Sequence, residues 1–431
     1  MADPAYTQCD PSVKNWTVAT PDGSWTDYYL YTNMGVPKGA VAEIIIANIQ
    51  TGTENLQGVR TDGGSLSRYA NVHEAEAGGE THIRMFVVCH ATTGLIELYG
   101  EDISDCKFYL VGYWQNVSFT ELWDSFTATN PSQWNNATMT AGASCVHHIV
   151  MANKEQDVAN TMGVRDYASS TERKILVHEP EAGGWNTLDM VCKTDSSRRL
   201  SIYSDDVTQA TFYDAGYFGT ELDFVEKWEE EPGTLTWGYF YPAGLDQNER
   251  MCDFLMLNKD ADTEQNLGVR AAGSSDVRYF LEHEAESAGG TDVEYSGFGM
   301  SAKTDSGGKV EAYLPTTATF LYFTGYFKPT AAGIVKFCPD TEALTEAAFV
   351  RRMWARYFTP NTESLPETLL GRMRSVRFSP DAESLVDALL RKGVLSARFL
   401  TETVAIAEGF VQKLIATIVR FASDKIGRAH V

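Results

Sequence analysis

The chain has 431 residues, of which 43% are hydrophobic and 12% aromatic, so it can form several packed cores and is not a disordered chain. Its formal net charge is -23, and the acidic excess lies before residue 336. An acidic surface repels phosphate backbones, which excludes nucleic acid as a partner of this part. The sequence contains no apolar run long enough for a membrane span, and none is expected.

One pattern of residues occurs three times, with successive copies about 105 residues apart. Each copy opens on an asparagine that ends an apolar run. It continues through Gly-Val-Arg and a second arginine to a His-Glu-x-Glu box followed by Gly-Gly. Solenoid units span only about 20–50 residues, so a repeat of this length is a repeated domain. The repeated polar residues are the candidate site residues: Arg60, Arg68, His73, Glu74 and Glu76; Arg165, Arg173, His178, Glu179 and Glu181; Arg270, Arg278, His283, Glu284 and Glu286.

Short apolar and β-branched runs alternate with turn clusters in each copy, which is typical of antiparallel strands. In the first copy the predicted strands are 27–31, 42–49, 58–60, 68–74, 81–90, 95–99 and 108–114. This density of strands favours a β-sandwich or jelly roll. We predict an all-β protein with three tandem antiparallel β-sandwich (jelly-roll-like) domains. The predicted domain ranges are 20–118, 127–222 and 233–330.

The stretches between these domains have a different pattern. Residues 119–126 and 221–230 show the only helical spacing in this part of the sequence. Each domain is expected to begin with a strand around a tryptophan, which is Trp25, Trp134 or Trp237. Because the linkers, turns and tryptophan-bearing loops do not repeat as the framework does, we expect any ligand specificity to lie there.

From residue 336 the chain carries a shorter repeat of 20–21 residues that begins with Phe-x-Pro-Asp or a close variant. Asp or Asn before a helix-forming run is an N-cap, so each unit is predicted to contain a short helix. Such small units need neighbours to bury their apolar faces, so residues 336–425 are expected to form a partly helical segment that supports a homo-oligomer. Residues 426–431 match the translation of a sequencing adapter, and we expect the natural chain to continue beyond them.

The His-Glu-x-Glu box has two interpretations. His73, Glu74 and Glu76 are residue types that bind Zn²⁺ or Ca²⁺. However, neighbouring side chains on a strand point to opposite faces, so His73 and Glu74 cannot both face one ion. We therefore favour a structural framework in which Arg60 or Arg68 pairs with a glutamate of the box. No catalytic residue, metal or cofactor is predicted, and the protein is not expected to be an enzyme.

Three further features bear on compartment and binding. Seven cysteines lack Cys-x-x-Cys spacing and do not recur in register, so we expect buried or free thiols. The first fifteen residues have no basic or apolar signal region, so no signal peptide is expected. Each copy ends on Tyr-x-x-Gly-Tyr-aromatic, which could form a carbohydrate platform but is better explained as core packing.

The unit resembles repeated β-sandwich modules of phage, archaeal-virus and microbial surface proteins. The resemblance is carried by Gly-Val-Arg, Gly64-Ser65 with Arg68, His-Glu-Ala-Glu-Ala-Gly-Gly and the stretch 109–114, and it spans about residues 20–330. It implies a structural or adhesive protein of a virion or cell surface, such as a fibre or tail component. The partners it implies are cell-surface glycans or other surface proteins. The alternatives are a carbohydrate-binding array of a polysaccharide-acting enzyme and a self-assembling filament subunit.

Overall fold

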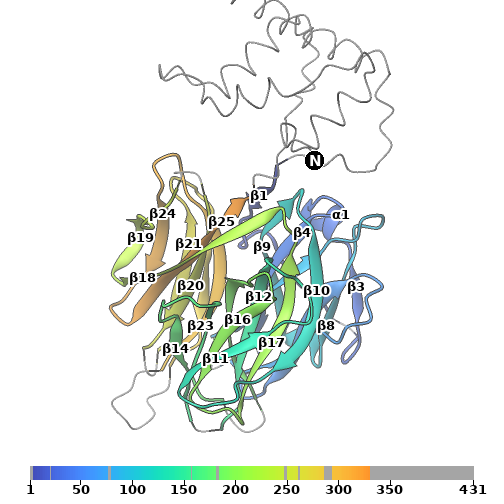
Figure 1. Cartoon of the computed structure of the whole chain (residues 1–431). Helices are drawn as coiled ribbons and strands as arrows, with labels where there is room; N and C mark the ends of the chain where they lie inside the picture. The colour runs from blue at the N-terminus through green and yellow to red at the C-terminus, as the bar shows by residue number, and fades with distance from the viewer. Residues whose placement is uncertain are drawn as a thin grey trace, which may run out of the picture. The chain divides into compact units, whose positions relative to one another are not determined.

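The computed structural model describes residues 3–19, 21–75, 79–156, 158–180, 184–246, 250–260, 263–285 and 294–330. The described residues belong to one compact unit (Figure 1). Glu76, Glu181 and Glu286 lie outside them, as do the predicted helical repeats of residues 336–425 and the hexapeptide 426–431. Among the described residues, no helix is long and apolar enough to cross a membrane.

The first repeat and the residues before it form module 1. Its elements are β1 (Ala5–Gln8), β2 (Asn15–Thr17), β3 (Thr26–Tyr28), α1 (Leu30–Met34), β4 (Val41–Asn48), β5 (Asn55–Thr61), β6 (Tyr69–Val72), β7 (Thr81–Val88), β8 (Ile96–Gly100), the 3-10 turn η1 (Ile103–Asp105) and β9 (Cys106–Gln115).

Modules 2 and 3 follow with eight strands each. Module 2 contains β10 (Phe119–Phe126), β11 (Gln133–Thr138), β12 (Val146–Asn153), β13 (Asn160–Asp166), β14 (Lys174–Val177), β15 (Asn186–Lys193), β16 (Arg199–Ser204) and β17 (Ala210–Phe218). Module 3 contains β18 (Leu222–Pro232), β19 (Leu235–Phe240), β20 (Met251–Asn258), β21 (Gln265–Ala271), β22 (Tyr279–Glu282), β23 (Ser296–Lys303), β24 (Val310–Leu314) and β25 (Thr319–Pro329).

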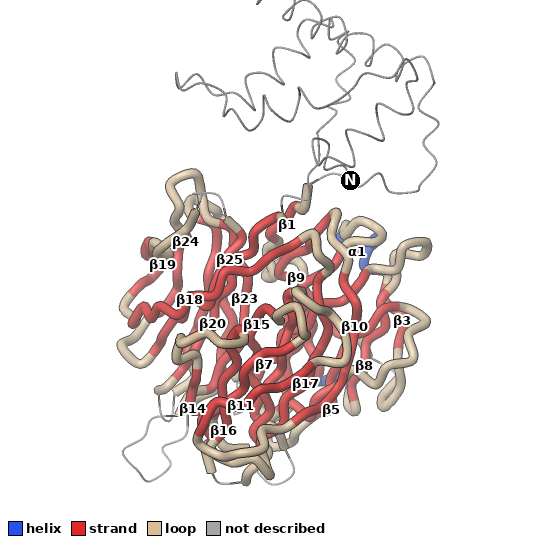
Figure 2. Tube along the Cα trace, in the orientation of Figure 1, coloured by secondary structure: helices blue, strands red, loops and turns tan. Residues whose placement is uncertain are grey.

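Each module has the strand order of a jelly roll. In module 2 one sheet has the order β10-β17-β12-β15 and the other β11-β16-β13-β14, and module 3 repeats this order strand for strand. Module 1 follows it too, except that β1 and β2 both pair with β9 in the place of one first strand. Figure 2 shows how strands dominate the described part of the chain. The predicted all-β, antiparallel, jelly-roll-like architecture is confirmed for this part.

The helical spacing of residues 119–126 and 221–230 was misleading, because these stretches form β10 and β18. Each pairs antiparallel with the last strand of its module. The pairing shifts register between Glu121 and Asp124 in β10, and between Glu226 and Glu229 in β18. A bulge of this kind interrupts the two-residue alternation of a strand, which explains why the sequence pattern imitates a helix.

Glycine in Gly-Val-Arg is explained by the close approach of two strands. A Cβ on Gly58, Gly163 or Gly268 would lie 1.9–2.2 Å from the carbonyl oxygen of the second arginine of the same repeat.

The described cysteines are free thiols, and all of them are buried except half-buried Cys9.

Three parallel bridges close the modules into a ring. The residue just before β7 bridges to the end of β22 (Glu80 with Glu282), and the residue before β15 bridges to the end of β6 (Trp185 with Val72). The residue before β23 bridges to the end of β14 (Tyr295 with Val177). Module 1 thus contacts module 3, module 2 contacts module 1, and module 3 contacts module 2. Equivalent residues make all three contacts, so the ring has a pseudo-threefold axis.

Candidate functional site

The second arginine of a repeat joins its own module to the next. Arg68 is fully buried, pairs with Glu121 of β10 at 3.3 Å and donates a hydrogen bond to the carbonyl of Ala215 at 2.8 Å. Both partners belong to module 2. Arg173 of module 2 is also fully buried, and it pairs with Glu226 of β18 in module 3 at 3.2 Å. The repetition of this arginine therefore reflects contacts between modules.

Arg278 completes the cycle from module 3 back to module 1. Its guanidinium donates to the carbonyls of Cys9 at 2.8 Å and of Val111. Val111 and Ala215 both lie at the register shift beside the glycine of Tyr-x-x-Gly-Tyr. That glycine is Gly216 in module 2, with a φ of +135°, where a Cβ would meet the carbonyl of Thr120 at 2.5 Å. The glycine allows the bulge that presents a carbonyl to the neighbouring arginine.

The first arginine of each repeat contacts its own module instead, and its side chain is 12–15% exposed. Its guanidinium stacks on a tryptophan: Arg60 on Trp25 at 4.0 Å, Arg165 on Trp134 at 3.9 Å and Arg270 on Trp237 at 3.8 Å. Tyrosines extend each stack, and we call each tryptophan with its arginine and tyrosines an aromatic platform. The tyrosines are Tyr69 and Tyr99 in module 1, Tyr203 in module 2, and Tyr279 and Tyr313 in module 3.

These partners differ from the predicted ones. The ion pairs of Arg60 and Arg68 are with Glu97 and Glu121. Glu74 lies half-buried beside His73 in the loop after β6, so the box does not continue the strand as predicted. Sequence reasoning searched for partners within one copy, but the second arginine finds its partner in the next module.

Side chains from all three modules meet in a central column along the pseudo-threefold axis. At one end lie the last aromatic residues of the repeats, Trp114, Phe218 and Phe327, which are at most 3% exposed. Their ring centroids lie 5.0–6.1 Å apart in edge-on contacts. Aromatic pairs in this geometry contribute beyond the area they bury. The prediction that one aromatic of each final pair packs inside holds in the first two copies, while in the third both Tyr326 and Phe327 are buried. The three buried residues at this end join the modules.

A buried ion cluster forms the middle of the column. Arg84 of β7 contacts Asp189 of β15 at 2.5 Å, Asp253 of β20 at 2.5 Å and Glu43 of β4 at 3.4 Å. Burial opposes the charge of Arg84, but the three carboxylates outweigh this and hold its pKa above the ordinary value. His148, at the position equivalent to Glu43, contacts Asp189 at 3.0 Å. One cation therefore binds acids from all three modules.

Sequence analysis missed this cluster because the three copies differ there. Arg84 and Asp189 occupy equivalent places on β7 and β15, while the third copy has Gly299. A search for identical residues passes over such positions. The available signal was a charged residue inside an otherwise apolar strand, because such a residue is almost never fully buried without a partner.

At the other end of the column, the three histidines of the boxes come together. His73, His178 and His283 are at most 2% exposed, and their ring centroids lie 5.3–6.0 Å apart. One ring nitrogen of each lies within 4.8 Å of those of the other two. Burial and the two neighbouring histidines lower the pKa of His73 to about 3, so this ring stays neutral.

The asparagine that opens each repeat holds its histidine in place. The side-chain amides donate to the histidine carbonyls: Asn48 to His73 at 2.9 Å, Asn153 to His178 at 3.1 Å and Asn258 to His283 at 2.9 Å. The side-chain oxygen accepts from the backbone N–H two residues later in each copy. This bonding explains why asparagine and histidine recur together.

The contact between modules 1 and 3 contains a buried histidine that lies between two glutamates. His82 of β7 lies 2.6 Å from Glu282 of β22 and 3.2 Å from Glu80. Burial lowers the pKa of His82, but both carboxylates raise it further, to about 9. Burial raises the pKa of Glu80, but His82, Tyr109 and Lys107 bring it down to about 2. His82 is therefore charged at neutral pH.

We expect stability to fall as the pH rises from about 6.5 to 9. The pKa of His82 is higher in the folded state, so its contribution is complete below the unfolded value of about 6.5 and is lost as the pH passes 9. The loss should reach a few kcal/mol at most. Urea unfolding of the wild type and His82→Gln at pH 6.5, 7.5 and 9 measures it. The slope should vanish in the variant, and an equal slope in both would contradict this assignment.

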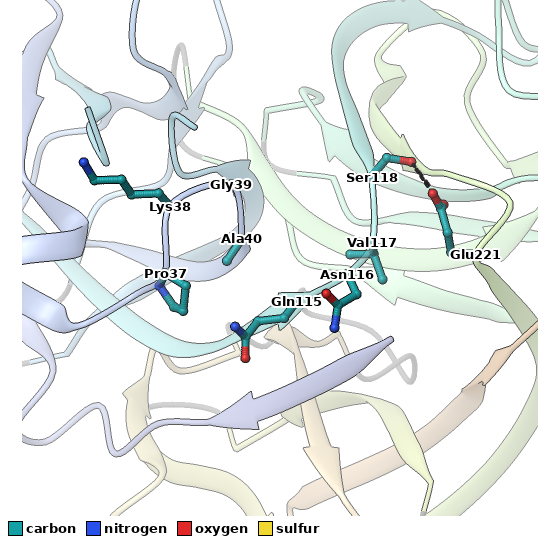
Figure 3. A pocket seen from close by; sticks show the side chains of 9 residues that line it. All are labelled: Pro37, Lys38, Gly39, Ala40, Gln115, Asn116, Val117, Ser118 and Glu221. Carbon is teal, nitrogen blue, oxygen red and sulfur yellow. Dashed lines mark hydrogen bonds between the residues drawn. The ribbon is translucent and has the colours of Figure 1, made fainter. Parts of the chain in front are cut away.

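A pocket lies near the end of the column that holds Trp114, because Val117 in its lining belongs to the same buried cluster as Trp114 (Figure 3). It is lined by the loop 37–40, the segment 115–118 and Glu221, with Ser118 donating to Glu221 at 3.1 Å. Lys38 and Glu221 are its ionisable residues, and Glu221 already accepts the serine hydroxyl. Among the residues that line this pocket, Ser118 and Glu221 form the one hydroxyl–carboxylate pair.

Comparison with family models gives no match, and comparison with curated proteins gives none either. A search of solved structures finds three chains of interest. A tandem CBM22 domain of Xyn10C from Paenibacillus barcinonensis is 12% identical and covers 47% of this chain and 85% of its own, with a TM-score of 0.15. A chain of Sulfolobus Turreted Icosahedral Virus is 8% identical and covers 68% and 80%, with a TM-score of 0.17.

The third chain comes from a structure of the triple jelly roll fold and turret assembly in an archaeal virus. It is 6% identical and covers 75% of this chain and 89% of its own, with a TM-score of 0.19. These likenesses agree with the resemblance to β-sandwich modules of viral and surface proteins. At TM-scores this low they carry no argument about function, which has to rest on the geometry of the chain itself.

Proposed function

We propose that the protein is a non-enzymatic structural and adhesive component of a virion surface, such as a fibre or tail, that displays three jelly-roll modules on one closed ring. The supporting observation is the use of the repeated residues. Arg68, Arg173 and Arg278 join modules in a cycle, and the central column joins them again. The residues that repeat most regularly are thus used to hold three modules together, which suits a structural role. Jelly rolls are also common building blocks of viral capsids.

The ionisable groups of the column, and those of the arginine–glutamate pairs between modules, support a non-enzymatic role. His147 and His148 each face a carboxylate, at 3.0 Å in both cases, and both are fully buried. Glu121 and Glu226 are held by arginines and by backbone N–H groups. A general acid or base needs access to substrate, and these groups lack it. We likewise propose that the box residues are framework rather than a ligand site for glycans.

Antibody labelling tests the virion assignment. Antibodies raised against the full chain are applied to a concentrated fraction of virus-sized particles from the source of the sequence, and labelled particles are viewed by electron microscopy. Label on particle surfaces is expected. Label confined to cell envelopes or to soluble protein would contradict a virion component and leave a cell-surface protein as the better reading.

The alternative is a carbohydrate-binding array, and the aromatic platforms favour it. Trp237, Tyr279 and Tyr313 form a partly exposed stack in module 3, with Tyr279 38% exposed. Flat aromatic faces stack on apolar sugar faces, and three linked platforms would bind by avidity. A glycan array probed with the full chain and with Trp237→Ala separates the two functions. Binding that Trp237→Ala weakens several-fold supports glycan recognition, and an array without signal supports a purely structural ring.

A further inference from the structure

We propose that His73, His178 and His283 together bind one divalent transition-metal ion, with zinc the best fit, where the three modules meet on the pseudo-threefold axis. The proposal does not depend on the virion assignment. It revises the metal hypothesis in one respect: the ligands come from three copies of the box and not from neighbouring residues of one copy.

The geometry of the histidine cluster suits a metal. One ring nitrogen of each histidine lies within 4.8 Å of those of the other two. Three imidazoles with one further position are a ligand set that zinc uses, at Zn–N distances of about 2.0–2.1 Å. Tetrahedral coordination then needs nitrogens about 3.4 Å apart. Small side-chain rotations, which bring the rings inward by roughly 1 Å, would supply this.

Two of the histidines are oriented as metal ligands are. His178 holds its Nδ1 2.7 Å from Oε2 of the buried Glu294. His283 holds its Nδ1 2.7 Å from the backbone carbonyl of Glu284. A carboxylate or carbonyl on one ring nitrogen fixes the tautomer and leaves the lone pair on the other, which is the usual support of metal-bound histidine. Each ligand comes from a different module, so one ion would bond all three.

Unpaired buried atoms provide independent support. Nδ1 of His73 and Nε2 of His178 have no hydrogen-bond partner in the described structure, and the same holds for Oε1 of Glu294. Leaving a buried polar atom unpaired costs about 1–3 kcal/mol. A dication would bind the nitrogens, and the Glu294 carboxylate would offset part of its charge.

The other buried histidines lack this arrangement. His82, His147 and His148 each face at least one carboxylate at 3.0 Å or less, as His178 does, but they do not form a group of three imidazoles. The axis cluster differs in having three imidazoles face one another.

Metal analysis of the full-length, tag-free protein tests the proposal. After zinc loading and exhaustive dialysis, mass spectrometry of the metal content should find one zinc per chain. Cobalt(II) added to the chelator-treated protein should give the strong visible absorption of a tetrahedral site. His178→Ala should lose both signals. His90→Ala removes a half-exposed histidine of the β7–β8 hairpin and serves as the matched control, which should keep both.

A second measurement needs no variant, so it stays informative if His178→Ala fails to fold. The unmodified protein should melt at a lower temperature after chelation and recover with one equivalent of zinc, because a ligand that binds only the folded state stabilises it. Sub-stoichiometric metal, no cobalt band and an unchanged melting temperature at ten equivalents of zinc would overturn the proposal. The cluster would then be a set of neutral imidazoles that pack without an ion.

Discussion

Replacing Arg84 with methionine is expected to destabilise the ring more than any other single change in the column. Arg84 is the cation between Glu43, Asp189 and Asp253, and all four side chains are at most 2% exposed. Methionine fills much of the volume but leaves three buried carboxylates without their counter-charge. Removing one partner of a buried ion pair costs about 3–5 kcal/mol. With three acids left facing one another, we expect the upper end of this range, measured by urea unfolding at pH 7.

The pH dependence of Arg84→Met separates loss of charge from loss of packing. Without Arg84, burial and mutual repulsion should raise the folded-state pKa values of the three acids above their unfolded values. Their contribution is then complete below about pH 4 and is lost as the pH rises through the folded values. The variant should therefore recover part of its lost stability between pH 7 and 5. Adding Asp189→Asn and Asp253→Asn should also recover part of it.

A surface arginine provides the control for this experiment. Arg199 pairs with Asp195 at 2.7 Å, with side chains 39% and 24% exposed. Exposed pairs are screened by solvent, so Arg199→Met should change the free energy of unfolding far less than Arg84→Met does. If Arg84→Met unfolds within 1 kcal/mol of the wild type, the ion cluster does not hold the modules together.

Arg68→Ala is expected to cost about 3–5 kcal/mol, again because it leaves buried partners unsatisfied. The fully buried guanidinium pairs with Glu121 and donates to the carbonyls of Val59, Phe86 and Ala215 at 2.8–3.1 Å. These groups lie in modules 1 and 2, so the loss should weaken the joint between them. Urea unfolding followed by tryptophan fluorescence gives the free energy, and protease sensitivity near β10 reports the joint.

The matched control is Arg60→Ala in the same repeat. Arg60 pairs with Glu97 at 2.7 Å near the surface, where both side chains are 12–14% exposed, and stacks on Trp25. Its loss should cost about 1–2 kcal/mol, less than that of Arg68. If Arg60→Ala and Arg68→Ala lowered the free energy of unfolding equally, the claim that Arg68 joins two modules while Arg60 serves only its own would be contradicted.

The fold class could be predicted from the sequence because the repeat and its strand periodicity are local features. The argument that His73 and Glu74 face opposite sides relied on strand alternation, but β6 ends at Val72 and both residues lie in the loop after it. What local periodicity cannot show is which copy a side chain contacts. Residues about 105 positions apart share one place on the axis, and a pattern read along one copy treats them as equivalents rather than neighbours.

The sequence pattern also could not show which repeated arginine contacts the next module. Arg60 and Arg68 recur with the same regularity, yet the first contacts its own module and the second contacts the next. Partners such as Glu121 lie in stretches that are outside the repeated pattern. The bulge in β10 also gives that stretch a helix-like spacing of apolar residues, so it was predicted as helical. The fate of residues 336–425 stays a prediction, because they lie outside the described residues.

Scanning calorimetry of the full-length protein tests the closed ring most directly. A ring whose modules share ion pairs, parallel bridges and a central column should unfold as one cooperative unit. The ratio of the calorimetric to the van't Hoff enthalpy for the jelly-roll transition should then be close to one. Three independently folding modules joined end to end would give a ratio near three or separate transitions, and that result would contradict the ring.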